Sequence, residues 1–496
     1  MTMIQINHLS FRYDEGFEDI FHDISFTIDS HFKTALIGRN ARGKTTLLKL
    51  MMGEYDYQGT IVMKERCEYF PYHVSNKKDR TLHICQNIYP SLEVWKLERE
   101  LNYLDVNLDV LYRSFDTLSQ GEQTKVLLAI LFLKENTFLL IDEPTNHLDQ
   151  ETRNRVSQYL KRQKGFLLVS HDRVFIDQCC DHIIAINPTT IDVVNGNFSS
   201  WFINKTNQDQ ENMQKNSHLK KDIQRLENAR KQTESWSHKI ENTKNGQRIS
   251  GVKADKGHIG HQAAKMMKRS KNIQRRQKQA IQDKRSLLND LEEYDDLKIQ
   301  PLSYHQNILL DFKHFGLYNQ EKTLFQDMTF SLERNDRILL KGKNGCGKSS
   351  LISFILNHNI DYRGEFYQAY QIKISYVPQD CSYLTGTLED IIESYHVKQS
   401  LVKTILRKLG FTRIQFEKKL ELYSKGQKKK VMLAISLATS AHLYIWDEPL
   451  NYIDVYSRIQ IEKMVLKYKP TLLFVEHDQC FQEKIATKVI DFNDFF

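Results

Sequence analysis

The sequence predicts an α/β fold in which two similar modules are joined by a long antiparallel helical hairpin. Three observations lead to this prediction. A glycine-rich phosphate-loop pattern occurs once in each half of the chain. Each copy is followed by the same further elements in the same order, and positive charge is concentrated in the segment between the copies. Repetition at a long and constant spacing indicates a duplicated domain.

The length and composition set the class of protein. A chain of 496 residues is too long for one hydrophobic core and suggests about three domains. No apolar run reaches the roughly 18 residues that a membrane-spanning helix needs. Strand-like residues begin at Ile4 without a signal peptide, so we expect a cytoplasmic protein with no membrane partner. The seven cysteines have no metal-ligand spacing, which gives no support to zinc or disulfides.

The first module contains a phosphate loop, Gly-Arg-Asn-Ala-Arg-Gly-Lys-Thr-Thr, at residues 38–46. An apolar run at 35–37 predicts a buried strand before it, and residues 47–50 continue as a helix. In this context the glycines let the backbone turn tightly around phosphates, the lysine reaches the β and γ phosphates, and the first threonine offers a hydroxyl to Mg²⁺. We therefore expect ATP and Mg²⁺ as cofactors, with contacts from Gly38, Asn40, Gly43, Lys44, Thr45 and Thr46.

Other residues of the first module fit the same site. Tyr13 lies between two predicted strands and is suited either to stack on adenine or to be half-buried in a strand. Ser119 and Gly121 precede a helix, where they form either a simple cap or part of a phosphate site. An apolar strand ends in Asp142 and Glu143, which are suited to hold Mg²⁺ and to orient or deprotonate water.

A further buried strand, at residues 166–169, ends just before His171. A histidine at the carboxyl end of a strand can contact a γ phosphate, although an ordinary loop histidine fits the same pattern.

The second module repeats every one of these elements. The spacing is 304 residues from Lys44 to Lys348, 305 from Ser119 to Ser424 and from Glu143 to Glu448, and 306 from His171 to His477. Four elements at one spacing indicate an internal duplication of an ATPase module. The second set of nucleotide contacts is expected from Tyr318, Gly342, Asn344, Gly345, Gly347, Lys348, Ser349 and Ser350, with Ser349 and Asp447 on the metal.

The segment between the modules is strongly basic. Residues 205–285 carry 21 lysines and arginines against 8 acidic residues, a net charge of +13, whereas the whole chain carries +8. Helical patterns at 204–241 and 262–294 predict two antiparallel helices with a narrow apolar seam, each roughly 50 Å long. Residues 242–271 form the expected tip. A solvated linker would tolerate this charge, but a one-signed prong suits RNA phosphates. The expected RNA contacts are Lys244, Arg248, Lys253, Lys256, Lys265, Lys268, Arg269 and Lys271.

The order of phosphate loop, serine–glycine signature, Asp-Glu strand end and histidine is similar to ABC-type ATPase domains. The resemblance implies two tandem ABC-type P-loop ATPase domains, at 1–203 and 301–496, flanking a linker at 204–300. It also implies head-to-tail pairing within a monomer, with each ATP between the phosphate loop of one module and the signature of the other. One site would join Lys44, Thr45, Asp142, Glu143 and His171 to Ser424 and Gly426. The other would join Lys348, Ser349, Asp447, Glu448 and His477 to Ser119 and Gly121.

The chain departs from the ABC pattern at three positions. The resemblance implies that Gln379, which follows Tyr-Val-Pro in the second module, contacts the nucleotide and the metal. Tyr72 stands at the matching position of the first module, which puts that module's metal or water contact in doubt. Gln120 and Lys425 stand where the signatures usually have glycine. Because both glutamates and both histidines remain, we expect two sites that hydrolyse ATP at unequal rates.

Two such modules with a basic linker resemble the ABC-F translation factors, with the stretches 146–149 and 195–198 fitting that class. The chain is also similar to the Lsa-type antibiotic-resistance proteins of Gram-positive bacteria. That resemblance rests on Ile-Gly-Arg-Asn at 37–40, Ala-Lys-Met-Met-Lys-Arg-Ser-Lys at 264–271 and Ile-Trp-Asp-Glu-Pro-Leu-Asn-Tyr at 445–452. It implies a protein that enters the tRNA exit site of the 70S ribosome, near 23S rRNA and the P-site tRNA. There it would displace lincosamides, streptogramin A or pleuromutilins from the peptidyl-transferase centre.

Two other functions are compatible with the same motifs. A factor that relieves stalled ribosomes without conferring resistance would carry the same modules and linker. The energy subunit of a drug exporter would carry the modules but would have no use for a long cationic linker.

Overall fold

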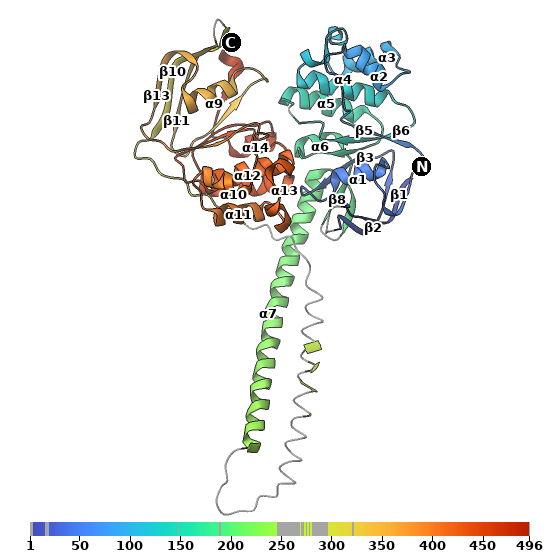
Figure 1. The fold of residues 1–496 in the computed structure, drawn as a ribbon, viewed down its shortest axis with the longest axis vertical. Coiled ribbons are helices and arrows are strands. Elements are labelled where there is room, and N and C mark those ends of the chain that lie inside the picture. Colours follow the sequence, from blue (N-terminus) through green and yellow to red (C-terminus); the bar gives the residue numbers. More distant parts are fainter. Residues whose placement is uncertain are drawn as a thin grey trace, which may run out of the picture. The chain divides into compact units, whose positions relative to one another are not determined.

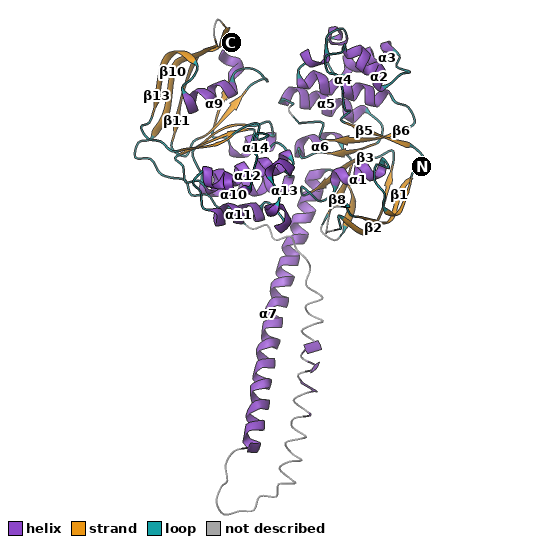
Figure 2. Cartoon of the chain, in the orientation of Figure 1, coloured by secondary structure: helices purple, strands orange, loops and turns teal. Residues whose placement is uncertain are grey.

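The computed structural model describes residues 3–495 except 15–18, 147, 188–189, 246–267, 269–271, 274, 277, 280–295 and 320–321. The chain divides into two compact units. One unit contains both modules, Met1–Ser199 and Tyr294–Phe496, and the other is Ser200–Glu293. Helices and strands alternate in both modules (Figure 1, Figure 2). The predicted boundaries at 203 and 301 stay predictions.

The first module contains a small antiparallel sheet and a larger, mostly parallel one. The antiparallel sheet has the order β2 (Phe21–Asp29), β1 (Met3–Phe11) and β4 (Gln58–Val62). The larger sheet has the order β5 (Arg66–Phe70), β6 (Thr137–Asp142), β7 (Phe166–Val169), β3 (Lys33–Gly38), β8 (His182–Ile186) and β9 (Ile191–Asn195). Its central strands read as continuous apolar runs because helices cover both faces of a parallel sheet.

The helices of the first module follow the strands in alternation. Two of them frame the predicted nucleotide motifs, since one follows the phosphate loop and another follows the signature. They are α1 (Lys44–Met51), α2 (Thr81–Ile88), α3 (Val94–Tyr103), α4 (Gln120–Leu133), α5 (Gln150–Arg162) and α6 (Arg173–Cys179).

The second module repeats this arrangement. Its antiparallel sheet has the order β11 (Lys322–Glu333), β10 (Ile308–Asn319) and β13 (Asp361–Gln368). Its parallel sheet has the order β14 (Ile374–Val377), β15 (Leu443–Asp447), β16 (Leu472–Val475), β12 (Arg337–Lys341) and β17 (Lys488–Asp491). Its helices are α9 (Lys348–Asn357), α10 (Leu388–Ser394), α11 (Gln399–Lys408), α12 (Lys425–Ala438), α13 (Val455–Tyr468) and α14 (Gln479–Ile485).

The strand register places the predicted motifs at one edge of each sheet. In the first module Asp142 pairs with Val169, so β6 and β7 end together. In the second module Asp447 pairs with Val475 in the same way. Since the carboxyl ends of parallel strands form the ligand-binding edge of such a sheet, the acidic strand ends and the loops that follow lie side by side.

The linker unit begins with one long helix, α7 (Phe198–Asn245), of 48 residues. It begins six residues before the predicted helix and ends four residues after it, so its length is about 72 Å rather than 50 Å. Lys244 lies in this helix and Lys268 is helical. Most of the predicted tip at 242–271 and of the second predicted helix at 262–294 lies outside the described residues, as do the other predicted RNA contacts, Arg248, Lys253, Lys256, Lys265, Arg269 and Lys271. In the part of the chain that the structure describes, no helix combines the length and apolar character needed to cross a membrane.

Candidate active sites

The two phosphate loops have the geometry that their sequences predict. Helix α1 begins directly after Gly43, whose φ of 84° is in the left-handed region. A Cβ atom at this glycine would lie 2.5 Å from Ile20 Cγ2, so another residue would be both strained and crowded. Lys44 Nζ donates hydrogen bonds to the carbonyls of Gly38 and Arg39, at 2.8 and 3.0 Å. The loop therefore holds an ammonium group at a helix N-terminus, which favours phosphate.

The second phosphate loop is built in the same way. Lys348 Nζ donates to the carbonyls of Gly342 and Lys343, both at 2.8 Å. Gly347 precedes α9 with a φ of 95°.

The acidic strand ends meet the hydroxyl groups of the phosphate loops. Thr45 Oγ1 donates to Asp142 Oδ2 at 2.8 Å, and Ser349 Oγ donates to Asp447 Oδ2 at 3.0 Å. Among the described atoms, the buried Asp447 Oδ1 has no hydrogen-bond partner, and burial raises the pKa of this carboxyl to about 6. A hydroxyl beside an unsatisfied carboxylate fits Mg²⁺, which takes few protein ligands and completes its shell with phosphate oxygens and water.

Each catalytic glutamate candidate sits at a sharp turn after its strand. Glu143 and Glu448 have φ values of 50° and 47°, a strained conformation that is concentrated at functional sites. Their amides donate to the last carbonyl of the neighbouring strand, at Val169 and Val475. His171 Nε2 lies 3.4 Å from Glu143 Oε1.

The matching pair in the second module is His477 Nε2 and Glu448 Oε1, at 3.5 Å. Each site thus aligns a carboxylate that can orient water with an imidazole that can contact a γ phosphate.

Two cavities lie between the modules, and each is lined by both of them. The first, of about 470 Å³, contains Lys44, Thr45, Asp142, Glu143 and His171 together with Ser424 and Gly426, as well as Asn40, Gly43 and Thr46. The second, of about 540 Å³, contains Ser119 and Gly121 together with Asn344, Gly345, Gly347, Lys348, Ser349, Ser350, Gln379 and Glu448. The structure thus brings together most residues of each predicted composite site.

Some predicted site residues do not line these two cavities. Gly342 and His477 border a neighbouring cavity of about 290 Å³. The Tyr13 hydroxyl hydrogen-bonds to Thr46 Oγ1 at 2.9 Å, so its ring lies beside the phosphate loop. Tyr318 has the Arg363 guanidinium 5.0 Å from its ring centre. An adenine-binding role for either tyrosine stays a prediction.

The first cavity is closed by a direct contact between the modules. Asn40 Nδ2 donates to the carbonyl of Tyr452 at 2.8 Å. The signature glycine, Gly426, lies against this contact, because a Cβ atom there would be 2.6 Å from the Tyr452 oxygen and 3.1 Å from Asn40 Nδ2. A side chain at position 426 would therefore clash with the Tyr452 carbonyl and crowd the Asn40 amide that reaches it from the other module.

The two sites differ where the sequence departs from the expected pattern. In the second module Gln379 Nε2 donates to Glu448 Oε1 at 2.8 Å. Lys429 Nζ donates to the carbonyls of Pro378 and Asp447, which fixes the glutamine loop beside the strand end.

In the first module Tyr72 turns to Glu68, which its hydroxyl contacts at 3.3 Å. Lys134 Nζ binds the same carboxylate at 2.8 Å and lies 5.0 Å from the Tyr72 ring centre. Instead, Tyr69 donates its hydroxyl to Asp142 Oδ2 at 3.0 Å.

The environments of the two glutamates differ accordingly. Burial, with a further contribution from Asp142, raises the pKa of Glu143 to about 8. Burial also acts on Glu448, but the nearby His477 imidazole and the hydrogen bond from Gln379 outweigh it and lower the pKa of that carboxyl to about 2. Glu448 is therefore held as a carboxylate, the form that can accept a proton from water.

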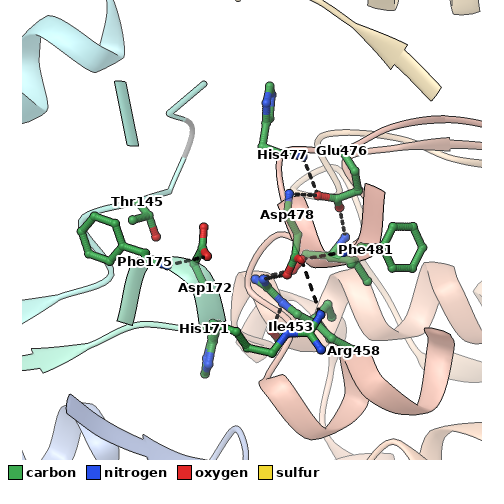
Figure 3. A network of polar contacts seen from close by, with 12 residues as sticks. Thr145, His171, Asp172, Phe175, Ile453, Arg458, Glu476, His477, Asp478 and Phe481 are labelled. Carbon is green, nitrogen blue, oxygen red and sulfur yellow. Dashed lines mark hydrogen bonds and ion pairs between the residues drawn. The ribbon is translucent and has the colours of Figure 1, made fainter. Parts of the chain in front are cut away.

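Sequence reasoning missed a network of buried charges between the modules, part of which Figure 3 shows around Arg458 and Asp478. Arg153 and Arg458 recur at the same spacing of 305 residues as the signatures, and this recurrence is the sequence feature that could have indicated the two arginines as matching positions. Arg173 binds Glu462 and Asp478 across the modules.

Comparison with known proteins agrees with this geometry. A family model described as ABC transporter matches residues 21–146 and 325–451, one match in each module. The chain is 28% identical over 524 residues to the ATP-binding protein Uup of Buchnera aphidicola, covering 98% of this chain and 80% of Uup. It is 27% identical over 487 residues to the ribosome protection protein VmlR of Bacillus subtilis, covering 95% and 84%.

A solved structure has the same fold. It is the crystal structure of a complex of the archaeal ribosomal stalk protein aP1 and the archaeal ribosome recycling factor aABCE1, with a TM-score of 0.63 at 17% identity, covering 98% of this chain and 87% of that chain. The predicted fold class, with two tandem ABC-type ATPase domains, is confirmed.

We predict that Glu448→Gln lowers steady-state ATP hydrolysis more than Glu143→Gln. Glu448 has its water-orienting partner Gln379 in place, whereas Glu143 lacks the matching partner because Tyr72 points elsewhere. Loss of a general base costs about 10²- to 10⁴-fold at the affected site, so the activity that remains belongs to the other site. Phosphate release by each single variant and by the double variant measures this difference. Equal losses in the two single variants would contradict it.

Proposed function

Because the chain belongs to the ABC transporter family of ATPases, we propose that its two ATP sites control binding to the ribosome through the basic linker. The protein hydrolyses ATP, and its relatives support membership of the ABC-F branch. The ribosome is proposed as the partner because the name of VmlR describes that relative as a ribosome protection protein.

One observation carries the proposal: the net charge of +13 between residues 205 and 285. The rest of the chain carries a net charge of −5, which is the +8 of the whole chain less the +13 of this segment, so the excess of positive charge lies in the linker. Lysines and arginines that neutralise nucleic-acid phosphates release counterions, which supplies much of the affinity for RNA. A membrane transporter subunit would need no such segment.

The proposed role is removal of antibiotics from the ribosome. The linker tip at 242–271 enters the tRNA exit site of the 70S ribosome and contacts 23S rRNA and the P-site tRNA. It displaces lincosamides, streptogramin A or pleuromutilins from the peptidyl-transferase centre, in the manner of Lsa-type proteins. The protein acts in the cytoplasm as a monomer whose own two modules pair.

The cavities between the modules supply the switch. Each phosphate loop faces the signature helix of the other module, so a γ phosphate in either cavity would bridge the two modules. ATP, bound together with Mg²⁺, supplies the negatively charged γ phosphate and the phosphate bond that is hydrolysed. Loss of that bridge frees the modules to separate, and the linker then leaves the ribosome.

Replacing both glutamates, Glu143→Gln with Glu448→Gln, should trap ATP and hold the protein on ribosomes. The double variant keeps both phosphate loops and both signatures but lacks the groups that activate water. Sedimentation with purified 70S ribosomes in the presence of ATP measures the bound fraction, and ADP is the control. If the double variant sediments with ribosomes no better than the wild type, the switch is wrong.

Neutralising the tip should weaken ribosome binding and abolish resistance. The variant carries alanine at Lys265, Lys268, Arg269 and Lys271, and its dissociation constant is measured against salt concentration. The slope of log K against log salt should fall by about 0.7 to 0.9 for each phosphate that the variant no longer neutralises. A matched control removes four exposed lysines of the second module, Lys398, Lys418, Lys419 and Lys463.

Drug susceptibility of cells that express the wild type, the tip variant and the control separates the candidate functions. Resistance that is absent only in the tip variant supports the proposal. Ribosome binding without any change in susceptibility would support a translation factor that relieves stalled ribosomes. Co-purification with a membrane permease, and without ribosomal RNA, would support an exporter subunit.

A further inference from the structure

Two buried arginines occupy equivalent positions in the two modules. Arg153 lies in α5 and Arg458 lies in α13, and their exposed fractions are 7% and 6%. Neither side chain is among the groups that line the two nucleotide cavities. Burial of a guanidinium is costly unless its donors are satisfied, so the partners of each arginine indicate what it holds in place.

Arg458 divides its donors between two loops of the second module. Its Nε and Nη2 donate to the carbonyls of Ile453 and Leu450, at 2.9 and 3.0 Å. Its Nη1 donates to Asp478 Oδ2 at 2.7 Å. The first loop follows Glu448, and the second begins with His477, so one planar group fixes both (Figure 3).

The loop at Leu450–Ile453 also reaches the first nucleotide site. Its residue Tyr452 lines the first cavity and accepts the hydrogen bond from Asn40 of the first phosphate loop. His171 Nε2 lies 3.1 Å from Asn40 Oδ1. A continuous path therefore runs from the phosphate loop of the first site, through Tyr452 and Arg458, to the loop that carries His477 at the second site.

Asp478 also caps a helix, so its position affects more than its ion pair with Arg458. Its Oδ1 accepts the amide of Phe481 and caps α14, while its Oδ2 binds Arg458. His477 directly precedes this residue. A shift of the arginine therefore acts on the start of α14 and on the histidine that faces Glu448, at 3.5 Å.

The first module contains the matching arrangement. Arg153 Nε donates to the carbonyl of Leu148, which lines the second cavity, at 3.0 Å. Its Nη1 donates to Asp172 Oδ2 at 2.9 Å, next to His171 of the first site. The same nitrogen lies 3.3 Å from the carbonyl of His477 across the modules. Each arginine thus connects a loop at one nucleotide site to the histidine, His171 or His477, of the other site.

We propose that Arg458 is a positioning residue that couples nucleotide binding at the first site to the placement of His477 at the second, with Arg153 acting in the opposite direction. A purely structural ion pair would need only the aspartate. The additional bonds to Leu450 and Ile453 attach the guanidinium to the loop whose Tyr452 carbonyl closes the first cavity.

The coupling can be measured when ATP is confined to the first site. The Lys348→Ala protein lacks the phosphate-loop lysine of the second site, so ATP binds only at the first. Hydrogen–deuterium exchange with mass spectrometry then follows residues 38–51, which report binding, and residues 472–485, which report the loop of His477. ATP should slow exchange in both segments.

Adding Arg458→Met should keep the protection of residues 38–51 but reduce the ATP-dependent protection of residues 472–485 at least about fivefold. A merely structural role would instead loosen residues 472–485 equally with and without ATP.

A second variant tests the same path in case the Arg458→Met protein does not fold. Asp478→Asn retains a side chain that can cap α14 but removes the charge that binds Arg458 and, more distantly, Arg173, and it should lose the same coupling. The two substitutions together should add little to either one, since both break one path. Arg334→Met, which removes an exposed arginine bonded to the carbonyl of Tyr304, is the matched control and should keep the coupling. Undiminished protection of residues 472–485 in both Arg458→Met and Asp478→Asn would overturn the proposal.

Discussion

The proposed mechanism depends on one structural constraint: each of the two nucleotide cavities is lined by residues of both modules. A triphosphate needs cationic groups and amide donors on several sides, and each phosphate loop supplies only one side. The other side is the N-terminus of a helix from the other module, where Ser424 and Ser119 accept hydrogen bonds from the amides of Gln427 and Glu122. The close approach of Gly426, Tyr452 and Asn40 shows how tightly the two halves must meet. Both nucleotide cavities are therefore completed by pairing of the modules, which supports the proposal that nucleotide binding and module pairing depend on each other.

The duplication has not kept the two sites alike. In the second module three consecutive lysines are buried in α12, and Lys429 joins the loop of Gln379 to the strand end at Asp447. In the first module the matching residues are Gln123, Thr124 and Lys125, and the loop of Tyr72 is held instead by Glu68 and Lys134. The same fold thus places one glutamate beside a water-orienting amide and leaves the other without it. Two sites that hydrolyse ATP at unequal rates would let such a protein bind its partner and leave it in separate steps.

The sequence was sufficient to predict the fold and most of the residues that line the two cavities, for a physical reason. Phosphate loops, acidic strand ends and signature turns each depend on local backbone geometry, so their residues keep fixed spacing and can be read directly. The length of α7 was underestimated at both ends. Its last turn, residues 242–245, has no apolar residue, whereas its first turn does have helical apolar spacing at Phe198, Trp201 and Phe202, which the prediction left in the first module. The partners of the two arginines were not predicted, because the recurrence of Arg153 and Arg458 at one spacing marks the positions but does not show which loops fold against each guanidinium. The substitute contact of Tyr69 with Asp142 is a similar case, since nothing in the local sequence shows that Tyr72 turns away.

Sharing of each site between the modules can be tested by one substitution measured in two backgrounds. In the Glu448→Gln protein ATP is hydrolysed only at the site of Lys44, and in the Glu143→Gln protein ATP is hydrolysed only at the site of Lys348. Adding Gly426→Asp places a bulky anion beside Asn40, where a Cβ atom alone would already be crowded. We expect this change to remove the ATP hydrolysis that remains in the Glu448→Gln protein and to spare that in the Glu143→Gln protein, although Gly426 and Lys348 belong to the same module. Loss of hydrolysis in the Glu143→Gln protein alone would show instead that each module works with its own signature.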